Sequence, residues 1–168
     1  MPITDFVEAQ APCYRVTLGL FSGAEYVAAF KRMPMPVSLN GEAERIFADP
    51  SFSRAEPGTE VELVLTSGRA LGVRARSLSL DYLSQVARAR DLRAGPPESI
   101  PAFVREHGAG LPAGVYTFAC RVRRGERSFL FNVTRCEEGI FLCAVDVPVP
   151  VSFDAGRILI LEAVRRLR

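Results

Sequence analysis

Apolar and polar residues alternate with a period of two along three stretches of the chain, residues 16–30, 61–75 and 116–133. This period is typical of β-strands that bury one face. Each stretch is interrupted near its middle by a glycine, which readily takes the positive φ that a short loop needs. The pattern therefore predicts three β-hairpins, with loops at residues 22–24 and 67–69 and a two-residue turn at Arg124-Gly125.

The hairpin registers place the large apolar residues on one face of each hairpin. The second hairpin is expected to carry two ion pairs on its outer face, Glu62–Arg74 and Glu60–Arg76. The third register pairs Tyr116 with Val133, Phe118 with Phe131 and Cys120 with Phe129. Residues 140–145, which follow, are apolar at every position, so we expect a strand that is buried on both faces.

Three segments carry the start and stop signals of helices. Asn40 is the expected N-cap of the first, and Pro50 ends it. Residues 80–92 place apolar side chains along one helical face, and Ser99 is the expected N-cap of the third helix. A short connector, 93–98, joins the second and third helices, for which we expect an antiparallel pair.

A nine-residue phrase occurs twice in similar form, as RMPMPVSLN at 32–40 and as DVPVPVSFD at 146–154. Prolines at alternate positions suit an edge strand, because they remove hydrogen-bond donors from one side only. Asp154 occupies the place of Asn40, and both are favoured N-caps, so the second phrase predicts a C-terminal helix. We interpret the phrases as parts of two related ββ units, 14–48 and 127–168, with a hairpin–helix–helix insert at 59–110; the alternative is coincidence between two edge strands.

The fold class expected from these elements is α+β. A mainly antiparallel sheet, an antiparallel helix pair and a C-terminal helix would form a single domain, 1–168. The alternative is two domains divided near residues 94–98. Limited proteolysis distinguishes them, because two stable fragments cut at RAGPPES would contradict the single domain.

Composition excludes some classes of protein. The 168 residues are 48% hydrophobic and 24% charged, a globular balance that excludes a disordered chain. The formal net charge of +2 is too small to predict a nucleic-acid or membrane partner. Asp5 and Glu8 do not suit a signal peptide, and the apolar stretch 158–164 is too short to cross a bilayer. We therefore expect a soluble, cytoplasmic protein.

The sequence predicts no catalytic, cofactor or metal site. Its four cysteines contain no Cys-x-x-Cys pair, and His107 is the one histidine, so a structural zinc site is not expected. The glycines of residues 108–114 follow a predicted helix, whereas those of phosphate-binding loops follow a strand. Residues 121–131 resemble the RNP1 pattern of RNA-recognition motifs, but Glu126 and Ser128 stand where aromatic rings are needed. This stretch is therefore interpreted as a charged hairpin tip.

The leading hypothesis for function is a non-catalytic interaction module, an adaptor, assembly or regulatory subunit that binds protein partners or itself. It follows from the missing combination of nucleophile, base and orienting group. One alternative is a nucleic-acid-binding protein that uses arginines of the hairpin and helix surfaces, namely Arg74, Arg76, Arg88, Arg90, Arg93, Arg121 and Arg123. The other is an enzyme or small-ligand protein whose pocket forms from positions far apart in the sequence.

Overall fold

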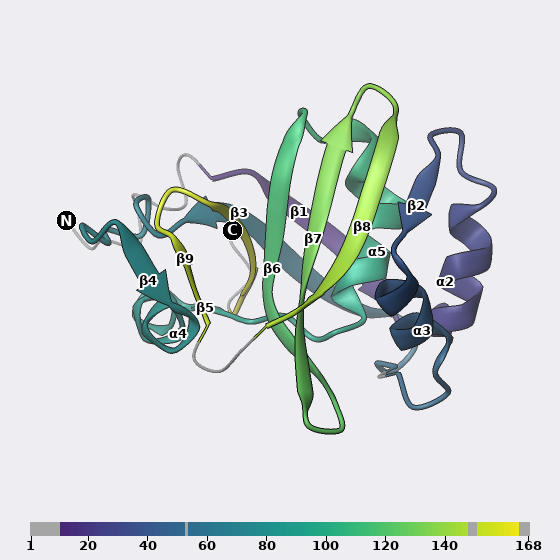
Figure 1. Ribbon diagram of the computed structural model, residues 1–168, viewed down its shortest axis with the longest axis horizontal. Coiled ribbons are helices and arrows are strands. Elements are labelled where there is room, and N and C mark those ends of the chain that lie inside the picture. The colour runs from purple at the N-terminus through teal and green to yellow at the C-terminus, as the bar shows by residue number, and fades with distance from the viewer. Residues whose placement is uncertain (1–10, 53, 148–150, 165–168) are drawn as a thin grey trace.

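The computed structural model describes residues 11–52, 54–147 and 151–164, which are organised around one mixed sheet (Figure 1). The strands lie in the order β1 (Cys13–Leu18), β3 (Thr59–Ser67), β10 (Ile158–Ala163), β6 (Gly114–Arg124), β7 (Arg127–Cys136), β8 (Gly139–Asp146) and β2 (Val37–Leu39), with β5 (Leu92–Arg93) also paired to β10. The pairings of β10 with β6 and of β2 with β8 are parallel, and the others are antiparallel. The α+β class is confirmed, with a mixed rather than a purely antiparallel sheet.

Each face of the sheet has its own core. One face packs against α2 (Gly23–Phe30), α3 (Gly41–Ala48) and α5 (Ser99–His107), which continues into the 3₁₀ turn η1 (Gly108–Gly110). The other packs against α4 (Leu80–Arg88) and a small sheet of β4 (Ser77–Ser79) and β9 (Ser152–Asp154). Adjacent residues of β3, Leu63 and Val64, accordingly belong to different buried clusters.

The helices predicted near 40–50, 80–92 and 99–108 are confirmed as α3, α4 and α5. The side chain of Asn40 caps α3 as expected, but the N-cap of α5 is Glu98 rather than Ser99. The predicted antiparallel pairing of α4 with α5 is not formed, because the two helices bury their apolar side chains in different clusters. No described helix is long and apolar enough to span a bilayer.

The first predicted hairpin is wrong, because its second arm is the helix α2. Ser22 and Glu25 form a capping box: the Ser22 hydroxyl accepts from the Glu25 amide at 3.3 Å, and the Glu25 carboxylate accepts from the Ser22 amide at 2.6 Å. Residues 23–30 also place Tyr26 and Phe30 one helical turn apart on the buried side. The alternating pattern was thus also compatible with a short helix, and the capping box decides the outcome.

The second predicted hairpin is also wrong. After Ser67 the chain turns within residues 68–73, where the Val73 amide donates to the Gly68 carbonyl at 2.8 Å, and it does not return beside β3. Instead β3 is sandwiched between β1 and β10, and the Glu62 carboxylate lies 3.1 Å from Arg15 of β1 rather than beside Arg74. Two long neighbouring strands pair and bury more of a strand with two covered faces than a short returning hairpin arm would.

The third hairpin is confirmed as β6 and β7, with a changed tip. Tyr116 pairs with Val133 and Phe118 with Phe131, as predicted, but two extra residues of β6 before Val122 shift the register. Val122, rather than Cys120, therefore faces Phe129, and the turn falls at residues 125–126. Strand β8 is confirmed too, but not its burial on both faces: Phe141 and Val145 are 38% and 42% exposed.

The repeated phrase does not mark two equivalent units. Residues 25–30 are helical, whereas the matching residues 139–144 lie in strand β8. Asp154 does not cap a helix: it ends β9, its carboxylate accepts from the Gly156 amide at 2.7 Å, and strand β10 follows. The predicted C-terminal helix is therefore wrong over residues 158–163, because this apolar run fills the position between β3 and β6. Residues 148–150 of the phrase lie outside the described residues, and the single-domain organisation stays a prediction.

Candidate interaction surface

The β6–β7–β8 part of the sheet has one covered and one open face. Phe131, Val133 and Leu142 point into the core beneath α3 and α5, so the alternate residues of these strands point the other way. Figure 1 looks onto that second face, and no helix crosses in front of β6, β7 and β8. We define the open sheet face by the outward residues Val115, Asn132, Thr134, Phe141, Cys143 and Val145.

The open sheet face combines exposed apolar side chains with satisfied polar groups. Val115 is 44% exposed and shares a row across the strands with Thr134 and Phe141. In the next row the Thr117 hydroxyl donates to the Asn132 side-chain oxygen at 2.7 Å, so these two groups are paired with each other. A β-sheet face that exposes apolar rows is a surface suited to packing against another protein layer.

The sequence did not indicate this face. The run of residues 140–145 reads as buried on both sides, and only long-range packing shows that α4, β4 and β9 leave its outer side open. Leu130 and Ala119, on the same side of the sheet, are covered as members of the second core. The single signal in the sequence is that the polar residues Asn132 and Thr134 alternate with the apolar residues Phe131 and Val133.

Side chains occupy the strand edge at two places, on the outer strand β1 and on β8 beyond the end of its pairing with β2. On β1, the Arg15 carbonyl lies 2.7 Å from Nε2 of His107, and the Thr17 amide donates to Glu106 at 3.4 Å. Beside β8, the side-chain amide of Asn40 donates to the Ala144 carbonyl at 2.9 Å and accepts from the Ala144 amide at 3.0 Å. These side chains take the place of a further strand.

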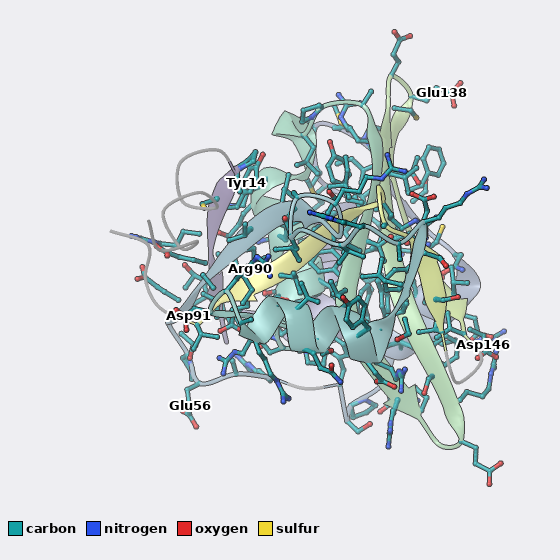
Figure 2. The ribbon with its side chains drawn as sticks, turned by 90° about the vertical axis from the view of Figure 1, so that its left-hand side faces the viewer. Tyr14, Glu56, Arg90, Asp91, Glu138 and Asp146 are labelled. Carbon is teal, nitrogen blue, oxygen red and sulfur yellow. The ribbon has the colours of Figure 1, made fainter. Side chains whose placement is uncertain are left out.

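The open sheet face has a basic and an acidic end. Arg121 and Arg123 lie at the β6–β7 tip, on the side of the open face. The Nε atom of Arg121 is buried without a hydrogen-bond partner among the described residues. Glu137 and Glu138 are exposed in the β7–β8 turn. Figure 2 shows Glu138 and Asp146 at opposite ends of the long strands.

The other arginines of the tip point toward α3 and are occupied. Arg127 donates to Asp146 at 2.8 Å and lies 3.5 Å from Glu42, while Arg124 bonds to Asp49. Hydrogen bonds from Arg124, and then from Ser51, hold the pKa of Asp49 well below its usual range. Arg121 and Arg123 are therefore the tip arginines without an ion pair within the described part of the chain, although Glu126 in the turn adds one negative charge.

The seven arginines predicted as contacts do not form one surface. Arg93 is occupied by a two-bond ion pair with the buried Glu162, at 2.7 and 3.1 Å. Arg121 and Arg123 lie at the basic end of the open sheet face. The remaining four lie around α4 and the turn that follows β3, namely Arg74, Arg76, Arg88 and Arg90.

Two hollows are lined by charged side chains that mostly pair with one another. One, of about 240 Å³, is lined by Glu42, Arg45, Ile46, Arg124, Arg127 and Phe129. The other, of about 190 Å³, is lined by Arg15, Glu60, Val61, Glu62, Glu162, Ala163 and Val164. Across residues 11–52, 54–147 and 151–164, no three His, Cys, Asp or Glu side chains are grouped to hold a metal ion. Neither hollow provides a positioned nucleophile and base.

No protein-family model matches the chain, and neither a curated protein nor a solved structure matches it significantly.

Proposed function

We propose that this chain is a non-catalytic interaction module that associates with a second copy of itself through the open sheet face. The observation that carries the proposal is the exposure of Val115, Phe141 and Val145 together on one side of β6 and β8. Burying these three side chains against another layer would remove apolar surface from water. The side chains bonded to Thr17 of β1 and to Ala144 of β8 disfavour addition of a further strand at these two places.

A second copy is the occupant whose charges fit. Two copies stacked face to face with antiparallel strands are related by a twofold axis, so that each contact occurs twice. Arg121 and Arg123 of one copy then lie against Glu137 and Glu138 of the other. These opposite charges attract each other across the interface.

The same arrangement places the middle of the face on the axis. The row of Asn132 and Cys143 lies between the charged ends, so each of these two residues faces the same residue of the other copy.

The four cysteines are free thiols, which suits a reducing compartment, and we place the module in the cytoplasm.

The double substitution Phe141→Asp with Val145→Asp tests the proposal. We expect the dissociation constant to rise by at least about 100-fold, because two apolar side chains at the centre of an interface often contribute several kcal/mol. Sedimentation velocity over a micromolar to submillimolar range should then show a dimer for the unchanged protein and a monomer for the variant.

Leu20→Asp is the matched control, because Leu20 is 47% exposed but lies outside the open sheet face. This variant should dimerise as the unchanged protein does. Circular dichroism confirms that each variant is folded. An unchanged protein that stays monomeric over the whole range, or a Leu20 variant that dissociates equally, contradicts the proposal.

A further inference from the structure

A second surface, separate from the open sheet face, gathers arginines from three segments. The turn after β3 contributes Arg69, Arg74 and Arg76, the end of α4 contributes Arg90, and the loop before β10 contributes Arg157. We call these five residues the basic loop cluster. We propose that the basic loop cluster binds the phosphate backbone of nucleic acid, without reading its sequence.

Backbone hydrogen bonds hold two of the three segments together. The Arg69 amide donates to the Ala155 carbonyl at 2.8 Å, and the Ala155 amide donates to the Arg76 carbonyl at 2.9 Å. One residue, Ala155, thus links both ends of the arginine-bearing turn to the loop that carries Arg157. β4 and β9 continue this pairing, with Ser77 opposite Asp154. These backbone bonds therefore hold the arginine-bearing turn and loop in a fixed arrangement.

Two glycines lie beside guanidinium groups of the cluster. A methyl group on Gly72 would lie 3.0 Å from an Nη atom of Arg90, and one on Gly156 would lie 3.0 Å from the Asp154 carboxylate and 3.5 Å from Nε of Arg69. Arg90 also donates to the Val86 carbonyl at 3.2 Å, which fixes its side chain over the turn. Figure 2 shows Arg90 beside α4.

The basic loop cluster carries more positive than negative charge. Elsewhere the structure pairs arginines with carboxylates, as at Arg15, Arg93 and Arg127. Within the described ranges, Arg69, Arg74, Arg76 and Arg157 form no such ion pair; Asp154 is nearby, and its carboxylate accepts from the Gly156 amide. Like charges held close together favour an anionic partner.

Phosphate groups fit this chemistry better than isolated carboxylates. The guanidinium fork donates two parallel hydrogen bonds to a phosphate, and a row of arginines can follow a row of phosphates. The cluster lies on turns and on a helix end, so it presents no helix or ribbon that would enter a groove and read bases. Binding should therefore depend on salt and not on base sequence.

A salt titration with a fluorescent 20-base-pair DNA duplex of arbitrary sequence tests the proposal. We expect the logarithm of the binding constant to fall with the logarithm of salt concentration, with a slope of about −3 to −5 if most of the five arginines make contact. Arg74→Ala with Arg76→Ala should reduce the magnitude of this slope by about 2. Both side chains are exposed and form no hydrogen bond or ion pair within the described part of the chain, so the variant should remain folded.

Lys31→Ala with Arg32→Ala is the matched control, because it removes the same charge just after the C-terminal end of α2, outside the basic loop cluster. This variant should keep the slope of the unchanged protein. Equal loss of binding in both variants, absent binding, or salt-independent binding overturns the proposal. So does a preference for vesicles of phosphatidylcholine with phosphatidylserine over the duplex at the same salt.

The titration is also informative if the chain does not self-associate. The Phe141→Asp, Val145→Asp protein keeps the basic loop cluster intact, so its slope should stay within the range expected for one copy. A protein that does not self-associate and a basic loop cluster that does not bind DNA therefore give different experimental results.

Discussion

Replacing Gly23 by alanine should destabilise the protein by about 3 kcal/mol or more, since overpacking of this kind is relieved only by moving backbone. Gly23 is the first residue of α2, and a Cβ atom there would overlap the carbonyl oxygen of Phe47 and lie 2.8 Å from its carbonyl carbon. Phe47 lies in the last turn of α3 and is completely buried. The methyl group would therefore force α2 and α3 apart, and urea denaturation should show a much lower midpoint.

Gly41→Ala is the matched control for this experiment. Gly41 is the first residue of α3, as Gly23 is of α2, but a Cβ atom at Gly41 meets nothing within 4 Å. Alanine there should be neutral or should stabilise the protein by up to about 1 kcal/mol. If both variants unfold at the same urea concentration, the close approach of the two helices is wrong.

Glu98→Gln should have the second large effect on stability. The Glu98 side chain is almost fully buried, and its carboxylate accepts from the Gly19 amide at 2.8 Å and from the Ala55 amide at 2.6 Å. A third bond comes from the Tyr26 hydroxyl at 3.3 Å. Burial, and then the Glu98 carboxylate, raise the pKa of Tyr26, so this hydroxyl stays protonated and donates.

Glutamine keeps the shape of Glu98 but replaces one acceptor oxygen by a donor. In either orientation its NH₂ group would face a backbone amide, and we expect a loss of about 2–3 kcal/mol of unfolding free energy. Glu106→Gln on the same helix is the control, because Glu106 is exposed and its contact with the Thr17 amide is 3.4 Å long. A Glu98 variant that unfolds at the same urea concentration as the Glu106 variant would show that the carboxylate network is not needed.

The parts of the fold that could be predicted from the sequence depend on local signals. Asn40 caps α3 because its side chain reaches the Ala43 amide three residues on, which any chain with this spacing can do. The β6–β7 hairpin was predictable because Phe118 and Phe131 flank one short turn and share one face. Its tip was not, since the two extra residues of β6 follow from the packing of Val122 rather than from the turn.

The parts that could not be predicted depend on neighbours far along the chain. Residues 158–163 form a strand because β3 and β6 leave a gap for them, and a helix at the same residues would leave one edge of each of these strands unpaired. The open sheet face has the same origin: Phe141 is exposed only because α4 packs over β3 and β10 and not over β8. Composition marks Phe141 as core, and the arrangement of the layers places it at the surface.

Three of the five arginines in the basic loop cluster were among the contact residues predicted from the sequence. Arg74, Arg76 and Arg90 were expected on a hairpin arm and a helix, and the structure brings them near one another through a turn instead. Arg69 and Arg157 were missed, because they join the cluster only through the backbone bonds to Ala155. Their signal in the sequence, one arginine after each of two Ser-Gly or Ala-Gly steps, is too common to identify a site.

In the proposed dimer, a second copy of the chain stacks on the open sheet face with antiparallel strands. Two charge-swapped variants test it in one measurement, the molar mass in solution by sedimentation equilibrium. The first carries Arg121→Glu and Arg123→Glu, and the second carries Glu137→Arg and Glu138→Arg. Each variant alone places like charges at both ends of the interface and should be monomeric, whereas an equimolar mixture should form a heterodimer with opposite charges at both ends. A mixture that stays monomeric, or variants that each dimerise alone as the unchanged protein does, would contradict the antiparallel arrangement.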